Sequence, residues 1–185
     1  EKWFIESSKY LTTYYGQLSF IKMYPGKKYS LVDEFKVFET YPKEFYRNPL
    51  IKAVLLLKEL NKTQYSKDII KHLAKLNTTK GSEVLAGKLS IEIGRYDYAI
   101  QVAKQASYEK RYLNEINYPI INTPIMINGK KMPNQELILA IIRQESEFDS
   151  KANSYVGAKG MMQLMSYTAR LVAKQAKLPY NKSRL

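Results

Sequence analysis

The sequence predicts an all-α protein in which helical hairpins precede a final helical segment of different character. Apolar residues recur at helical spacing along most of the chain, and Gly and Pro fall mostly at segment boundaries. The 185 residues are 45% hydrophobic and 12% aromatic, which is enough to bury a core. The chain has no cysteine, which excludes a disulfide framework and a thiolate metal site.

The periodicity predicts eight helices, which lie near residues 2–14, 29–41, 48–60, 64–76, 80–93, 95–106, 134–148 and 159–176. The first six form short antiparallel hairpins, with turn signals at 61–63, at 77–79 and at Gly94. No strict period of about 34 residues recurs, so we expect stacked hairpins and not tetratricopeptide repeats.

The segment 117–133 interrupts the helical pattern. Pro119, Pro124 and Pro133 exclude one continuous helix, so we expect an extended connection. Asn128-Gly129, between short apolar runs, favours a tight hairpin. A long helix then begins near Asn134, a suitable N-cap directly after Pro133.

The charge of the chain limits its partners. Thirty basic residues against 17 acidic ones give a net charge of +13. This favours an anionic partner, either nucleic acid, a membrane surface or an acidic polymer; a soluble basic surface without such a partner is the alternative. No basic run resembles a nucleic-acid-binding arm. No apolar stretch of about 18 residues could span a membrane, and residues 1–3 lead into no signal peptide.

One carboxylate breaks the pattern of the helix 134–148. On a helical wheel, the apolar residues fall on one arc: Leu137, Ile138, Ile141, Ile142 and Phe148. The opposite side carries Glu136, Arg143, Ser146 and Glu147. Glu145 lies inside the apolar arc, where burial of a carboxylate costs several kcal/mol unless it is paired or protonated.

Two interpretations of Glu145 follow from the helix. Desolvation raises the pKa of a carboxyl, and a carboxyl that stays protonated near neutral pH can act as a general acid on a glycosidic bond. The alternative is a core carboxylate that the backbone or Arg170 satisfies. Glu147 and Asp149 are expected on the solvent side or just past the helix end.

The residues after this helix favour the catalytic interpretation. Ser154, Gly157, Ala158 and Gly160 predict a turn that allows close approach of a ligand or a neighbouring helix. A run of methionines follows in 161–165, as a flexible apolar wall or as part of the core. Gln163 within this run suits an amide or a sugar hydroxyl.

The pattern from Ala140 to Ala169 resembles the signature of soluble lytic transglycosylases of the Slt type. The matching residues are Ala140-Ile141-Ile142-Arg143-Gln144-Glu145-Ser146-Glu147-Phe148, Ala152, Ser154, Gly157-Ala158, Gly160-Met161-Met162-Gln163 and Thr168-Ala169. Two positions differ in residue type, because the family usually has Leu where Met161 stands inside the matched stretch and Pro where Ser166 stands. Upstream, residues 13–18 are similar to the end of the family's superhelical scaffold.

The resemblance implies an organisation and a chemistry. Residues 1–46 would end an α-superhelical scaffold, 47–113 would form a helical linker domain, and 114–185 would begin a lysozyme-like catalytic domain that continues past Leu185. Glu145 would be the single catalytic acid and base, without metal or cofactor. The residues that hold the sugars would be Ser154, Gln163, Met165 and Thr168.

The resemblance also implies the substrate and the place of action. The substrate would be the MurNAc–GlcNAc strand of peptidoglycan, cleaved without water to leave 1,6-anhydroMurNAc ends during murein turnover in the periplasm. Two alternatives stay open: a lysozyme-like hydrolase, which needs a water placed by a second carboxylate, and a non-enzymatic helical scaffold that binds peptides or nucleic acid.

Overall fold

The structure is a computed structural model that describes residues 1–29, 31, 43–76, 81–127 and 129–181. Helices dominate it, and the one sheet in this part of the chain has two strands of two residues each, which confirms the predicted all-α fold class. The chain divides into two compact units, residues 1–34 and 35–185. The expected domain boundaries near residues 47 and 114 stay a prediction.

The first unit contains two short helices, α1 (Lys2–Ser7) and α2 (Tyr14–Met23). The predicted helix 2–14 is therefore wrong, because it ends at Ser7 and a second helix starts at Tyr14. Thr13 caps α2, since its Oγ1 accepts a hydrogen bond from the amide of Gly16 at 3.1 Å. A Cβ on Gly16 would lie 1.9 Å from the carbonyl oxygen of Tyr10, so this position requires glycine.

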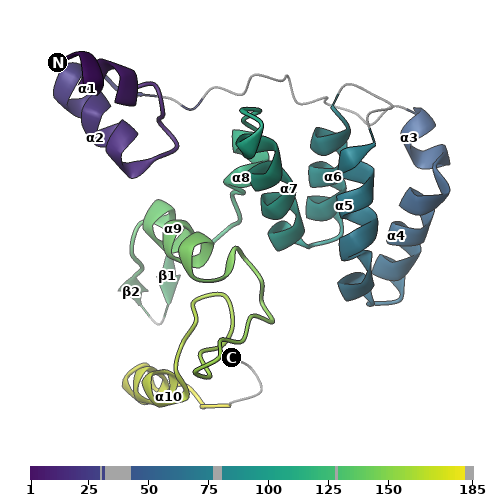
Figure 1. The fold of residues 1–185 in the computed structure, drawn as a ribbon. Coiled ribbons are helices and arrows are strands. Elements are labelled where there is room, and N and C mark those ends of the chain that lie inside the picture. The colour runs from purple at the N-terminus through teal and green to yellow at the C-terminus, as the bar shows by residue number, and fades with distance from the viewer. Residues whose placement is uncertain (30, 32–42, 77–80, 128, 182–185) are drawn as a thin grey trace. The chain divides into compact units, whose positions relative to one another are not determined.

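The second unit begins with a stack of helices whose neighbours lie side by side in Figure 1. Its elements are α3 (Lys43–Arg47), α4 (Pro49–Glu59), the 3-10 helix η1 (Thr63–Ser66), α5 (Lys67–Lys75), α6 (Ser82–Glu92), α7 (Tyr96–Tyr108) and α8 (Asn114–Asn117). This confirms the helices predicted at 48–60, 64–76, 80–93 and 95–106. The predicted helix 29–41 and the turn 77–79 lie almost entirely outside the described residues.

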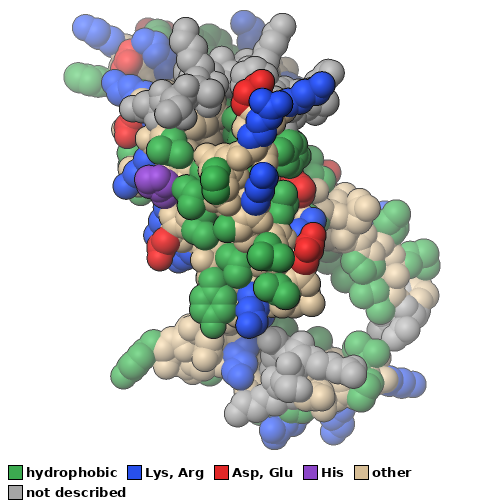
Figure 2. Space-filling model, turned by 90° about the vertical axis from the view of Figure 1, so that its right-hand side faces the viewer, with side chains coloured by type: hydrophobic (Ala, Val, Ile, Leu, Met, Phe, Trp, Pro, Cys, Tyr) green, Lys and Arg blue, Asp and Glu red, His purple; other side chains and the backbone are tan. Residues whose placement is uncertain are grey.

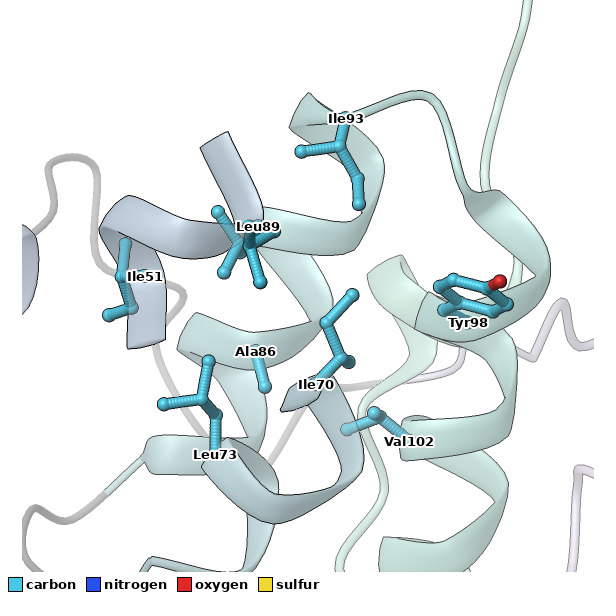
Figure 3. Close-up of a cluster of buried hydrophobic side chains, with 9 residues drawn as sticks. Ile51, Ile70, Leu73, Ala86, Leu89, Ile93, Tyr98 and Val102 are labelled. Carbon is cyan, nitrogen blue, oxygen red and sulfur yellow. The ribbon is translucent and has the colours of Figure 1, made fainter. Parts of the chain in front are cut away.

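Two apolar clusters hold the stack together. The first joins α4 to α7 and contains Ile51, Val54, Ile70, Leu73, Ala86, Leu89, Ile93, Tyr98 and Val102, most of them labelled in Figure 3. The second joins α6, α7 and the segment around α8, and contains Val84, Ala99, Ala103, Ala106, Leu113 and Ile116. Both α6 and α7 contribute to the two clusters, and α7 also contributes Ile100 to a third, so these two helices form the centre of the stack.

The outer face of the stack is mixed in character. Figure 2 shows hydrophobic side chains interspersed with Lys and Arg on the side that carries α3 and α4. Among the exposed apolar residues there are Leu56 and Leu60, at 55% and 56% exposure. In the described part of the chain, no helix is both long and apolar enough to cross a membrane.

The rest of the second unit carries the segment with the signature. Strands β1 (Met126–Ile127) and β2 (Lys130–Lys131) pair antiparallel around Gly129, which agrees with the predicted hairpin. Helix α9 (Gln135–Ser146) confirms the helix predicted at 134–148, with an end two residues earlier. Helix α10 (Ser166–Gln175) starts seven residues later than predicted, so the expected helix over 159–165 is wrong.

Candidate active site

Helix α9 is docked on the hairpin stack by one face. Ile142 is buried and shares an apolar cluster with Ile100 of α7 and with Phe148. Ile138 and Leu139 pack against the same cluster. This contact places the last turn of α9 directly beside α7, and Glu145 is in that turn.

A second anchor holds the outer side of the same turn. The Arg143 guanidinium donates from Nε to the carbonyl oxygen of Asn117 at 2.9 Å and from its terminal nitrogen to Asn117 Oδ1 at 2.6 Å. Its carbon lies 5.4 Å from the ring centre of Tyr118. Arg143 was expected on the solvent side, but this two-point bond joins α9 to the segment after α8 and leaves the guanidinium half-buried.

Glu145 is exposed, which corrects the expectation that it lies among buried apolar residues. The buried face of α9 is turned away from it, because Ser146 is drawn inward: its hydroxyl donates to the carbonyl oxygen of Met161 at 2.8 Å. Glu145 instead ends a row with Leu137 and Ile141, spaced four residues apart and exposed by 55% and 38%. Within the described part of the chain, its carboxylate has no hydrogen bond or ion pair.

Two left-handed residues end α9 directly after the site. Glu147 has φ 52° and Phe148 has φ 68°, a conformation that costs an L-residue other than glycine about 1–2 kcal/mol. Phe148 is 4% exposed, and its ring centre lies 6.0 Å from that of Tyr96. Lys104 Nζ lies 2.5 Å from Glu147 Oε1. Glu147 lies just past the end of α9, one of the two positions expected for it, and its side chain is half-buried by this ion pair with α7.

The following loop is built from backbone pairs, which is why it does not form the expected helix. Isolated bridges join Lys159 to both Asn153 and Leu164. Gly157 has φ 87°, where a Cβ would be strained, and Gln163 has φ 47°. These positive φ values are incompatible with a right-handed helix through 157–163.

Ser154 and Gln163, both predicted to hold sugars, also brace this loop. Ser154 Oγ accepts from the amide of Ala158 at 2.9 Å. Gln163 Nε2 donates to the carbonyl oxygens of Gly160 at 2.9 Å and Ala152 at 3.3 Å. Each side chain is half-buried, and Gln163 Oε1 accepts no hydrogen bond among the described residues. The Ser154 hydroxyl proton and Gln163 Oε1, neither of which has a partner among the described residues, therefore stay available to a ligand.

Met165 and Thr168, the other two predicted sugar-binding residues, lie at the start of α10. Met165 is the N-cap residue and is 43% exposed, and Thr168 is also exposed. In the described ranges, no hydrogen bond joins Glu145 to any of the four predicted sugar-binding residues. The loop is instead tied to α9 through Ser146 and Met161. Arg170, the alternative partner of Glu145, stacks on Tyr180 at 5.3 Å.

A groove of about 660 Å³ lies on the hairpin stack and not at Glu145. Its walls come from α5, with Lys71 and Lys75, and from α7, with Gln101, Lys104 and Gln105. We place the candidate active site at Glu145 despite this groove, because a general acid must reach its substrate and the groove contains no comparable carboxyl. Its acids, Glu83 and Glu109, are both paired with Arg111.

Among the residues that the structure describes, no three His, Cys, Asp or Glu side chains gather at one point where they could hold an ion. The nearest carboxylates along the chain are separately engaged: Glu147 pairs with Lys104, and Asp149 Oδ1 accepts from the amide of Lys151 at 2.9 Å.

Comparisons with known proteins find a family model that matches this segment and a solved structure with a similar fold. The family model named Transglycosylase SLT domain matches residues 122–185. No curated protein matches the chain. Among solved structures, the 70-kDa soluble lytic transglycosylase Slt70 of Escherichia coli is similar, with 21% identity and a TM-score of 0.66. The same enzyme in complex with bulgecin A gives the same values.

The similarity to Slt70 covers 95% of this chain and 28% of that one, so the chain spans less than a third of the length of the solved proteins. At 21% identity this structural similarity shows the fold alone. The segment that the family model matches contains Glu145. The resemblance predicted from the sequence is supported in two ways: residues 122–185 match the Transglycosylase SLT domain model, and the chain has an all-α fold similar to that of the soluble lytic transglycosylase Slt70.

Proposed function

We propose that this protein is a peptidoglycan lytic transglycosylase in which Glu145 acts first as general acid and then as general base. The observation that carries the proposal is the position of Glu145 within the family segment. It ends an exposed apolar row on α9, and its carboxylate is unpaired in the described part of the chain. A general acid has to meet these two conditions, access to the substrate and freedom from a competing cation.

The row of Leu137, Ile141 and Glu145 suits a sugar strand. Apolar side chains can cover the face of a sugar ring, while the carboxyl at the end of the row reaches the glycosidic oxygen. A bound ring would exclude water from the exposed carboxyl. The sequence suggested that the Glu145 carboxyl is buried in the free protein. We propose instead that it is desolvated only when a sugar strand is bound.

The proposed reaction uses one carboxyl in two steps. Protonated Glu145 donates its proton to the oxygen between MurNAc and GlcNAc, and this bond breaks. By the family resemblance, the N-acetyl oxygen of the sugar stabilises the positive charge at C1, in place of a second carboxylate. Ionised Glu145 then takes the proton of the MurNAc C6 hydroxyl as that oxygen closes on C1. The product is a 1,6-anhydro ring, and no water is consumed.

Ser154, Gln163, Met165 and Thr168 are proposed to hold the strand. Each has an exposed or half-buried side chain, and Ser154 and Gln163 are held in place by the loop bonds described above. Fixed polar groups orient a ligand at less entropic cost than mobile ones. Because peptidoglycan lies outside the cytoplasmic membrane, we propose a periplasmic or cell-wall location.

Hydrolysis on the same fold is less well supported. An inverting hydrolase needs a second carboxylate on the opposite side of the sugar to activate water. Glu147 is engaged by Lys104, and Asp149 accepts a backbone hydrogen bond. Neither is free for that task.

The test is Glu145→Gln in the full-length protein, which keeps the size of the side chain and removes the proton transfer. Release of muropeptides from purified sacculi should fall by about 10²–10⁴-fold, with strand binding retained. The matched control is Glu136→Gln, an exposed glutamate in the first turn of the same helix, which should cleave at the wild-type rate. Cleavage by Glu145→Gln at the level of the control would exclude Glu145 as the catalytic group.

A further inference from the structure

One face of α7 contacts the turn that follows Glu145. Tyr96, Ile100 and Lys104 are spaced four residues apart on α7 and so lie in one row. The first two residues of this row pack against Phe148, and Lys104 forms an ion pair with Glu147 at 2.5 Å. The hairpin stack therefore contacts both left-handed residues of the turn.

The conformation of this turn decides what lies beside Glu145. If α9 continued as a regular helix through residue 148, Phe148 would lie three residues after Glu145 and on its side of the helix. The left-handed backbone at residues 147 and 148 instead directs the Phe148 ring to Ile100, where it is 4% exposed. The turn thus keeps a large aromatic ring away from the catalytic carboxyl.

The turn needs contacts that hold it, because neither residue is glycine. The amide of Asp149 donates a hydrogen bond to the carbonyl oxygen of Ser146 at 3.0 Å. This bond closes the turn, but it does not by itself favour the left-handed conformation at residues 147 and 148. Phe148 anchors the second residue by burial. The first residue, Glu147, has its side chain fixed by Lys104, across 43 residues of sequence.

We infer that Lys104 of α7 is a positioning residue for Glu145: its ion pair with Glu147 holds the left-handed turn that keeps the catalytic carboxyl open and oriented. This rests on the proposed function. In this inference Lys104 acts on Glu145 only through Glu147. The ion pair is partly exposed, with side-chain exposures of 44% and 27%, so its contribution to overall stability is small. Its effect is therefore expected in turnover.

The experiment measures kcat, KM and Tm of the full-length protein for Lys104→Met, Lys104→Arg, Glu147→Gln and the exchanged pair Lys104→Glu with Glu147→Lys. Lys104→Met and Glu147→Gln should each lower kcat on the order of tenfold, because small misplacements of a catalytic group have effects of this size or larger. KM should stay within about twofold and Tm within about 3 °C. Lys104→Arg and the exchanged pair should recover most of the lost kcat.

The matched control is Lys75→Met, which removes an exposed lysine of the same stack that has no ion pair among the described residues. It should leave kcat unchanged. Wild-type kcat in Lys104→Met, or a loss that neither Lys104→Arg nor the exchanged pair recovers, would overturn the inference. A wild-type protein that forms no 1,6-anhydro ends would instead overturn the proposed function, so the two failures are distinguishable.

Discussion

The packing of Phe148 can be tested by truncation, with a magnitude that follows from its burial. The ring is 4% exposed and packs against Ile100, Ile142 and Tyr96. An aromatic side chain buries at least about 150 Å², which at about 25 cal/mol per Å² corresponds to about 4 kcal/mol. Phe148→Ala should therefore lower the free energy of unfolding by about 3–5 kcal/mol, the range found for Phe→Ala in cores.

The same position also tests the left-handed backbone. Alanine usually stabilises a chain relative to glycine by about 0.5–1 kcal/mol. At φ 68°, however, alanine carries a steric cost of about 1–2 kcal/mol that glycine does not. Phe148→Gly should therefore be as stable as Phe148→Ala or more stable by up to about 1.5 kcal/mol, the reverse of the usual order.

Urea unfolding followed by far-ultraviolet circular dichroism would measure both differences at a shared m-value. The matched control is Tyr167→Ala, which removes an aromatic ring that is 76% exposed and should change the free energy of unfolding by less than about 0.5 kcal/mol. A loss below about 1 kcal/mol for Phe148→Ala would refute the packing described here. An alanine variant clearly more stable than the glycine variant would refute the left-handed turn.

Two further predictions concern pH and salt. Burial raises the pKa of Tyr98 above its usual value of 10.0, so the folded chain keeps the phenol proton longer than the unfolded chain, and stability should fall as pH rises above about 10. In urea titrations at several pH values, Tyr98→Phe should lose less stability above about pH 10 than the wild type. At neutral pH it should cost about 1 kcal/mol, because the hydrogen bond to the Gln64 carbonyl oxygen is lost. An unchanged dependence of stability on alkaline pH would contradict the raised pKa of Tyr98. Sacculus binding should weaken as salt rises towards about 0.5 M, because the net charge of +13 attracts anionic stem peptides through screened interactions. Sedimentation of the protein with sacculi measures the bound fraction at each salt concentration. Binding that does not change with salt would contradict a role of the net charge in substrate binding.

Local sequence signals were sufficient for most helices of the stack. The Asn48 cap with Pro49 marks the start of α4, and apolar spacing predicts α4 to α7 within a few residues. The failure at the N-terminus also has a local cause. The helix predicted at 2–14 ends before Gly16, but Gly16 lies inside α2, where close contact with the Tyr10 carbonyl leaves no room for a side chain. Propensity alone cannot detect such a contact.

The site was harder to predict, because its geometry depends on contacts far apart in the sequence. The helical wheel placed Glu145 among apolar residues but could not show which part of the apolar arc is buried by the rest of the protein. The hydrogen bond from Ser146 to Met161 determines which side of α9 is buried. The loop that carries Met161 has a positive φ at Gln163, and the sequence gives no sign of it because this residue is not glycine. The ion pair between Lys104 and Glu147 spans 43 residues and has no sequence pattern.

The measurement that tests the central claim most directly is the mass of the glycan ends. Sacculi whose existing ends have been chemically reduced would be digested by the full-length protein in water labelled with heavy oxygen, and the products separated by mass spectrometry. The account predicts new ends that lack one water and carry no label, formed by the wild type and by Glu136→Gln but not by Glu145→Gln. New reducing ends that carry the heavy oxygen would make the protein a hydrolase and would contradict the account.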